Sequence, residues 1–248
     1  MISPSTRQQG AQEYAIRPVS PVQDAADLAG TMVRAFYQDP HWASLWKNIT
    51  LDEIIYDCER RLPRNLIGDL GIKRHQKAVH MATGKAVGYA RWILPEGAAD
   101  EERWADAAVP AVDDSTRRQF EQLFDSVTHD GGKIRHLNEA MVGELSIAIE
   151  VAEERVRRGD AEFLTLDYLA THPDHQRCGV GSMLLRSGLA YADEKRLKVL
   201  VVAKTPGVKL YEDHGFCIVE VVEQERPQYG WSTPYRTTIL VRQPKAMV

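Results

Sequence analysis

Residues 161–181 have the sequence AEFLTLDYLATHPDHQRCGVG. The first ten are apolar on both alternating faces, which is typical of a buried β-strand. The rest form a polar loop with glycines at 179 and 181, and a helical pattern follows over residues 181–192. Free amides at a helix N-terminus bind anions, and glycines let the backbone approach the anion closely. The stretch predicts a strand, a pyrophosphate-binding loop and a helix.

Two other nucleotide-binding loops are excluded by single positions. A Walker A loop requires Gly-Lys followed by Ser or Thr, whereas Gly181 is followed by Ser182 and Met183. A dinucleotide fingerprint requires a third small residue where Leu184 stands, and it usually follows the first strand of a domain.

A second block follows after a buried strand over residues 198–203: residues 206–216 are PGVKLYEDHGF. Gln176-x-x-Gly179-x-Gly181 together with this block resembles the GCN5-related N-acetyltransferase (GNAT) family, whose signatures are Arg/Gln-x-x-Gly-x-Gly/Ala and Leu-Tyr-x-x-x-Gly-Phe. The resemblance covers residues 161–222 by motif and 14–94 by element order. Residues 88–92 and 166–173 also resemble fungal members of the family with unassigned substrates.

The resemblance implies a fold and a co-substrate. The fold is α/β, with a mixed central sheet of about six or seven strands that is flanked by helices and splayed between its fourth and fifth strands. The co-substrate is acetyl-CoA, whose pantetheine arm lies along the fourth strand. The implied contacts are Leu169, Ala170, Thr171, Gln176, Arg177, Cys178, Gly179, Val180, Gly181 and Ser182. Lys204 stands where the family commonly has Asn, so a contact made by that Asn is not carried over.

Two side chains are candidates for proton transfer. Tyr211 matches the family tyrosine that protonates the departing thiolate, although it can also pack as an aromatic beside Phe216. Strand alternation places Thr165, Asp167, Leu169 and Thr171 on one face, and desolvation of Asp167 would raise its pKa toward that of a useful base. Alternatively, Asp167 accepts structural hydrogen bonds or holds a cationic substrate.

Other candidates for the chemistry are weaker. His172 is a reserve base, and some family members use a chain of water molecules instead. His172, His175 and Cys178 have spacings that match no common metal site, so no metal is expected. Cys178 also lacks an evident partner for a covalent route.

The acceptor pocket of the family lies between the first two helices, the fourth strand and the loop joining the last two strands. In this sequence these regions contribute aromatic side chains, which are Phe36, Tyr37, His41, Trp42, Trp46, Tyr229, Trp231 and Tyr235. Such a wall suits a small, partly apolar primary amine, although ordinary core packing would also explain it. The alternative functions are acetylation of a protein N-terminus or lysine, and CoA binding without turnover.

The remaining elements complete one domain over residues 1–248. Strands are expected at 14–19, 73–82, 86–94, 216–222 and 236–241, with helices at 20–36, 51–70 and 207–214. Pro63 should kink or split the second helix, and Asp39-Pro40 should end the first. Residues 95–160 form an acidic insertion of two or three helices before the fourth strand, either a solvated face or a lid over the substrate.

Composition excludes several classes of function. No apolar run approaches the roughly 20 residues of a membrane span, and residues 1–10 lack the apolar core of a secretory signal. The net charge of -4 and the dispersed basic residues do not favour nucleic acid as a partner. Three scattered cysteines fit a reducing compartment. A cytoplasmic enzyme is therefore expected, with the nucleus as a second location.

Overall fold

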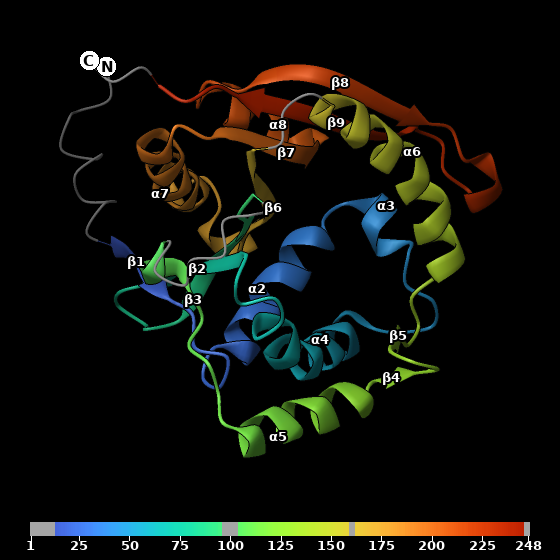
Figure 1. Ribbon diagram of the computed structural model, residues 1–248. Helices are drawn as coiled ribbons and strands as arrows, with labels where there is room; N and C mark the ends of the chain where they lie inside the picture. The colour runs from blue at the N-terminus through green and yellow to red at the C-terminus, as the bar shows by residue number, and fades with distance from the viewer. Residues whose placement is uncertain (1–12, 96–103, 159–161, 246–248) are drawn as a thin grey trace.

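The computed structural model of the chain describes residues 13–95, 104–158 and 162–245 (Figure 1). Residues 1–10 and parts of the expected insertion, 96–103 and 159–160, lie outside the described residues. The strands of the main sheet are β1 (Tyr14–Pro18), β2 (Lys73–His80), β3 (Ala86–Ile93), β6 (Phe163–Thr171), β7 (Lys198–Lys204), β8 (Cys217–Gln224) and β9 (Tyr235–Arg242). The helices are α2 (Ala25–Phe36), α3 (Pro40–Ala43), α4 (Leu51–Leu66), α5 (Asp114–Asp125), α6 (Glu139–Arg157), α7 (Val180–Lys195) and α8 (Thr205–Glu212).

The seven strands form one mixed sheet in the order β1-β2-β3-β6-β7-β9-β8. All neighbouring strands are antiparallel except β6 and β7, which are parallel and connected through α7. A parallel pair requires such a crossover, and the turn at Gly179 begins it. The expected α/β fold with a mixed sheet of about seven strands is confirmed.

The sheet opens between its fourth and fifth strands. β6 and β7 pair only from Phe163 with Lys198 to Leu166 with Val201. Beyond that point β6 still pairs with β3 as far as Thr171, and β7 still pairs with β9 as far as Lys204. The predicted splay therefore begins directly after Leu166.

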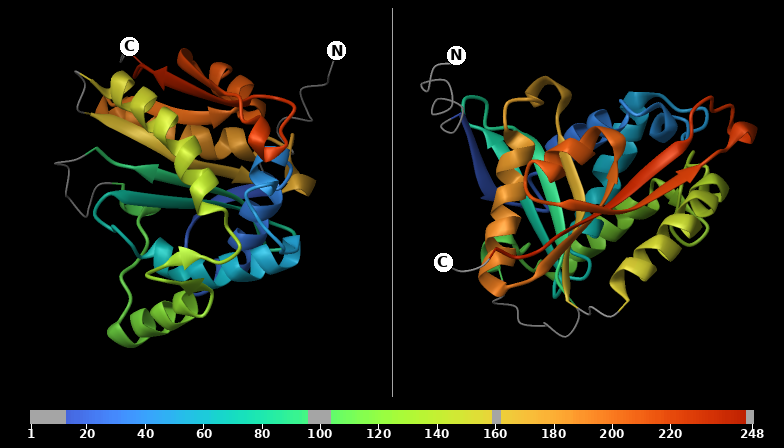
Figure 2. Two further views of the ribbon diagram at one scale, coloured as in Figure 1. Left: turned by 90° about the vertical axis from the view of Figure 1, so that its right-hand side faces the viewer. Right: turned by 90° about the horizontal axis from the view of Figure 1, so that it is seen from above.

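Helices cover both faces of the sheet, as the two views in Figure 2 show. α7 packs against β3 and β6 on one face, in a core that includes Trp92, Leu184 and Leu189. α2 and α4 cover the N-terminal half of the other face, around Leu28 and Leu66. α6 covers the C-terminal half beside β8. No helix in the described part of the chain is long and apolar enough to cross a bilayer.

A β-bulge changes the faces of β6. Arg91 pairs with Tyr168 but Trp92 pairs with Leu166, so Asp167 is the extra residue. Leu166 and Leu169 consequently pack in the core beneath α7, whereas Tyr168 and Ala170 pack beneath α2 and α4. The prediction of one continuous face through Thr165, Asp167, Leu169 and Thr171 is wrong, because strict alternation ends at the bulge.

Local turn chemistry produces three further differences from the expected elements. Pro63 does not split α4, because it lies in the last turn of a single helix. Asp39 does not end α2, which stops at Phe36, but caps α3 by accepting a hydrogen bond from the amide of His41. The insertion contains α5 and α6 as expected, together with a small hairpin of β4 (Thr128–His129) and β5 (Lys133–Ile134) that the sequence pattern did not indicate.

Candidate active site

The loop between β6 and α7 has the geometry of an anion site. Gly179 is the N-cap of α7 at a φ of 86°, and no side chain caps the helix. The first amides of a helix have no intrahelical partner, so those of Val180, Gly181 and Ser182 are available to a ligand. Gly179 is required by its left-handed backbone. A Cβ on Gly181 would meet only ordinary contacts, 3.5 Å from Leu210.

Side chains of this loop are tied to their surroundings. The Gln176 amide donates to Gln38 Oε1 at 2.9 Å and to the Thr171 carbonyl at 3.3 Å. These bonds fix the loop against the segment between α2 and α3. Cys178 is exposed at the tip of the loop. Gln176 thus positions the loop, and the backbone amides stay open.

The free edge of β6 lies next to this loop. Leu169 and Ala170 pair with Ala90 and Tyr89 of β3 on one side. On the other side β7 has already diverged, since its last pair with β6 is at Leu166. The geometry agrees with the expectation of a strand edge at which an extended ligand can add.

Tyr211 lies on α8, on the α7 side of the splay. Its side chain is buried in the same core as Leu184 and Ala203, and its ring contacts Phe216 with centroids 5.6 Å apart. Within the described residues its hydroxyl has no hydrogen-bond partner. Burial raises the pKa of Tyr211 well above that of an ordinary tyrosine. The hydroxyl is therefore a protonated group that can donate.

Asp167 is at the bulge, where β6 and β7 separate. Its carboxylate forms an ion pair with Arg91 of β3, whose guanidinium lies 5.2 Å from the ring centroid of Tyr168. The Asp167 side chain is 37% exposed. The expected desolvation is not found, because Asp167 is hydrated and paired with a cation.

The predicted aromatic residues assemble into one wall on the opposite face of the sheet from α7. Phe36 contacts Trp42 and Tyr168, with the Tyr168 ring at 4.9 Å. Trp231 of the β8–β9 loop stacks with Tyr235 at 5.6 Å and contacts His41 at 4.6 Å. The wall continues through Tyr37, Trp46 and Tyr229. Segments more than 180 residues apart in the chain thus form one surface.

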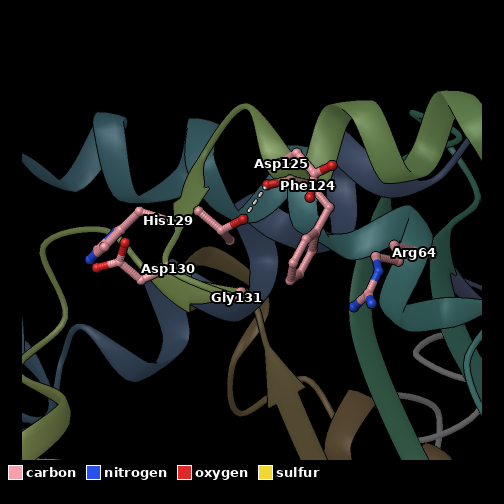
Figure 3. A pocket seen from close by; sticks show the side chains of 8 residues that line it. Arg64, Phe124, Asp125, His129, Asp130 and Gly131 are labelled. Carbon is pink, nitrogen blue, oxygen red and sulfur yellow. Dashed lines mark hydrogen bonds between the residues drawn. The ribbon is translucent and has the colours of Figure 1, made fainter.

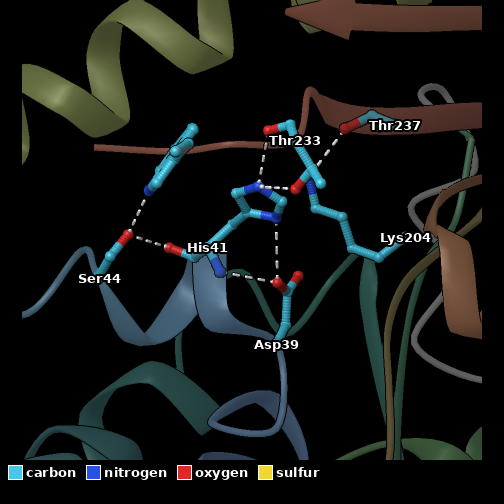
Figure 4. A network of polar contacts seen from close by, with 7 residues as sticks. Asp39, His41, Ser44, Lys204, Thr233 and Thr237 are labelled. Carbon is cyan, nitrogen blue, oxygen red and sulfur yellow. Dashed lines mark hydrogen bonds and ion pairs between the residues drawn. The ribbon is translucent and has the colours of Figure 1, made fainter. Parts of the chain in front are cut away.

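Hydrogen bonds hold this wall together, as Figure 4 shows. His41 lies between Asp39, whose carboxylate is 3.4 Å from Nδ1, and the Thr233 carbonyl, 3.2 Å from Nε2. Trp231 Nε1 donates to Ser44 Oγ at 2.9 Å. The β8–β9 loop is thereby attached to the α3 segment.

Lys204 lies beside the aromatic wall, in an environment that the sequence pattern did not reveal. It ends β7, and its Nζ donates to Thr237 Oγ1 at 2.8 Å and lies 3.4 Å from the ring centroid of Tyr235. Burial lowers the pKa of Lys204 to about 8. The sequence signals were that Lys204 follows the apolar run VLVVA and stands where the family commonly has Asn.

One hollow of the surface lies away from this site. It measures about 310 Å³ and is lined by α4, α5 and the β4–β5 hairpin (Figure 3). The guanidinium carbon of Arg64 lies 4.2 Å from the ring centroid of Phe124. No residue of β6, β7 or α7 lines it. Across the described residues there is also no group of three or more His, Cys, Asp or Glu side chains that could hold a metal.

Comparisons with known proteins agree with this geometry. Residues 135–218 match the acetyltransferase (GNAT) domain. No curated protein matches the chain significantly in sequence.

Solved structures share the fold across nearly the whole chain. A histone acetyltransferase and related acetyltransferase from Corynebacterium glutamicum is 16% identical, with a TM-score of 0.53 over 95% of this chain and 98% of that one. A mosquito arylalkylamine N-acetyltransferase is 13% identical, with a TM-score of 0.51 over 93% and 99%. An agmatine N-acetyltransferase is 12% identical, with a TM-score of 0.53 over 93% and 99%.

Proposed function

We propose that this chain, an acetyl-CoA-dependent N-acetyltransferase of the GNAT family, acetylates the primary amine of a small molecule by direct attack in a ternary complex. The observation that carries the proposal is the splay after Leu166. It has an anion-binding helix end on one side of the sheet and an aromatic wall on the other.

The cofactor site of the proposal is made mainly of backbone. The amides of residues 177–181 hold the pyrophosphate at the positive end of α7. The open edges of Leu169, Ala170 and Thr171 hold the pantetheine arm. Backbone groups buried without partners are costly, so a free strand edge inside the fold is explained by a ligand that pairs with it.

Tyr211 is the proposed proton donor to the leaving thiolate. Its free hydroxyl and raised pKa support this role, since the group stays protonated throughout the physiological pH range. A thiol has a pKa near 8.5, so proton donation assists its departure at neutral pH.

Asp167 is the proposed electrostatic partner of the acceptor amine. Its place at the start of the splay and its ion pair with Arg91 support a role in binding charge rather than an isolated base. A carboxylate that remains charged attracts an approaching ammonium group. Asp167 thus matches the alternative of holding a cationic substrate.

The acceptor is proposed to be a small, partly apolar amine. The aromatic wall supports this class, because Trp42, Trp231 and Tyr235 are only partly buried and belong to one apolar cluster near the carboxylate of Asp39. The insertion is attached beside the wall, since the Asn138 amide donates to the Leu45 carbonyl and the Lys47 amide donates to the His136 carbonyl. A helical segment held there leaves less room for a peptide chain than for a compact acceptor.

Thiol release from acetyl-CoA with a panel of acceptors tests the proposal. Arylalkylamines, aliphatic diamines, amino acids and peptides with free N-termini or lysines are compared at equal concentration. The proposal expects the highest kcat/KM for an aromatic or apolar small amine. A preference for peptides would support protein acetylation, and tight CoA binding without turnover would support a non-catalytic module.

A further inference from the structure

Lys204 is a half-buried amine whose direct contacts include no carboxylate. It forms no ion pair within the described part of the chain, and its partners are one hydroxyl and one aromatic face. An ammonium group that is removed from water without a carboxylate is destabilised as a cation. Such a side chain is costly as packing, so a function is the better explanation.

Strand alternation fixes the side of the sheet on which Lys204 acts. Val199, Val201 and Ala203 of β7 point into the core beneath α7, whereas Leu200 and Val202 point to the other face. Lys204 follows Leu200 and Val202, and its side chain bonds to Thr237, its pairing partner on β9. It therefore lies on the side of the aromatic wall.

Tyr211 lies on the opposite side of the same opening. α8 begins at Thr205, directly after Lys204, and carries Tyr211 into the core beneath α7. The splay is thus bordered by a neutral hydroxyl on one face and an amine on the other. Direct acetyl transfer needs one group to protonate the thiolate and another to deprotonate the acceptor.

We propose that Lys204 is the general base that accepts a proton from the acceptor ammonium. This inference rests on the proposed function and adds the identity of the base. The groups that face Lys204 are Asp39 and His41 from the α3 segment and Tyr235 from β9. Asp39 is the carboxylate among them, and its charge balances one cation in the site.

The proton balance of the step is complete. The acceptor ammonium gives one proton to neutral Lys204, and its nitrogen attacks the thioester carbonyl. The N–C bond forms and the C–S bond breaks, and the thiolate takes the proton of Tyr211. The second amine proton restores Tyr211, and Lys204 releases its proton to solvent.

The driving force favours Lys204 over a carboxylate in this role. An alkyl ammonium has a pKa near 10.4, and Lys204 has a pKa of about 8, so the transfer is uphill by roughly two units. Transfer to an ordinary carboxylate with a pKa near 4 is uphill by about six units. With a pKa of about 8, about a tenth of Lys204 is neutral at pH 7.

The test compares Lys204→Met and Lys204→Arg with Lys209→Met, an exposed lysine of α8 that pairs with Asp213. The dependence of kcat/KM on pH is measured with the best acceptor, and CoA affinity is measured by calorimetry. Arginine keeps the charge and can keep the contacts to Tyr235 and Thr237, but it cannot accept a proton. Both Lys204 variants are expected to lose about a hundredfold in kcat/KM at pH 7 and to regain activity as the pH rises.

A second measurement does not depend on turnover. Acetic anhydride labels neutral lysines. The folded protein is labelled at several pH values, and mass spectrometry then gives, for each lysine, the pH at which its labelling is half maximal. Lys204 is expected to have a midpoint near pH 8. Lys209 is expected well above it, because its bond to Asp213 raises its pKa.

The outcomes distinguish a failure of Lys204 as the general base from a failure of the proposed acetyltransferase activity. Full activity in Lys204→Arg, or a Lys204 midpoint above about pH 10, rejects Lys204 as the base while acetyl transfer stands. Loss of the acid limb of the pH profile only in Asp167→Asn assigns the base to Asp167 instead. Absence of turnover with every acceptor removes the proposed function, and the proton transfer with it.

Discussion

The indole of Trp92 occupies the space that a side chain on Gly188 would need. A Cβ on Gly188 would lie 2.0 Å from Cζ2 of Trp92. Trp92 is fully buried between the sheet and α7. The absence of a side chain at Gly188 therefore allows α7, the helix that begins at the proposed pyrophosphate loop, to pack directly against Trp92 of β3.

Gly188→Ala is expected to lower the free energy of unfolding by about 2–3 kcal/mol, because the core must shift to admit a methyl group. Gly143→Ala is the matched control, since nothing lies within 4 Å of a Cβ on Gly143 in α6. Alanine there should raise stability by up to about 1 kcal/mol. Urea denaturation measures both, and equal stability of the two variants would contradict this packing.

Gly179→Ala is expected to weaken CoA binding about tenfold, because alanine opposes the positive φ that begins α7. Gly84→Ala is the control: Gly84 has a φ of 70° in the turn between β2 and β3. Both variants should lose about 1 kcal/mol of stability. Calorimetry should find weaker CoA binding only for Gly179→Ala. Equal CoA affinities of the two variants would show that the loop does not bind the cofactor.

Tyr211→Phe is expected to lower kcat about a hundredfold and to leave CoA affinity within about twofold, because the hydroxyl acts only on the leaving thiolate. Tyr56→Phe, at an exposed position of α4, is the control and should keep full activity. Steady-state thiol release measures kcat. Undiminished kcat in Tyr211→Phe would leave the ring with a packing role beside Phe216.

The three cysteines are expected to react differently with a thiol reagent. Cys178 and Cys217 are exposed, whereas burial raises the pKa of Cys58 to about 11 and keeps it unreactive. CoA should protect Cys178 at the tip of the loop and leave Cys217 unprotected. Mass spectrometry after timed alkylation gives the alkylation rate of each cysteine. Equal rates for Cys178 with and without CoA would show that CoA does not bind at the loop.

Stability is expected to fall in acid through Asp193. Arg242 donates two hydrogen bonds of 2.8 Å to Asp193, and these lower its pKa below the usual 3.8. A carboxyl with a lowered folded pKa contributes stability above its unfolded pKa and loses it as the pH falls through the folded value. Wild type should therefore lose stability below about pH 4.

The matched variants separate Asp193 from general acid unfolding. Asp193→Asn should cost about 2–3 kcal/mol at pH 7 and reduce the acid-dependent loss, because Arg242 is buried without its partner. Asp213→Asn, at an exposed pair of α8, should change little. Thermal melts between pH 3 and 7 measure this, and parallel curves for wild type and Asp193→Asn would refute the assignment.

Much of the fold could be predicted because its signals are local. The apolar strand before Gly179, the loop glycines and the block around Tyr211 are each short and continuous. The strand order then follows from the family resemblance. Aromatic residues from both ends of the chain were also predicted to meet, and they do.

The missed features depend on contacts between distant segments. The bulge at Asp167 is set by the pairing of β6 with β3, so no pattern within β6 indicates it. The low pKa of Lys204 arises from burial against Tyr235, more than 30 residues away. The role of Asp39 as the cap of α3 is the exception, because it depends on a local hydrogen bond from the amide of His41.

The short pairing of β6 with β7 also has a mechanical consequence. Four residue pairs join the two halves of the sheet, so strand amides beyond Leu166 and Val201 should exchange faster than those within the four pairs. A ligand that adds strand-like hydrogen bonds at that edge should stabilise it and slow this exchange. The free energy of unfolding should then rise with the concentration of CoA, because a ligand that binds the folded state stabilises it by mass action.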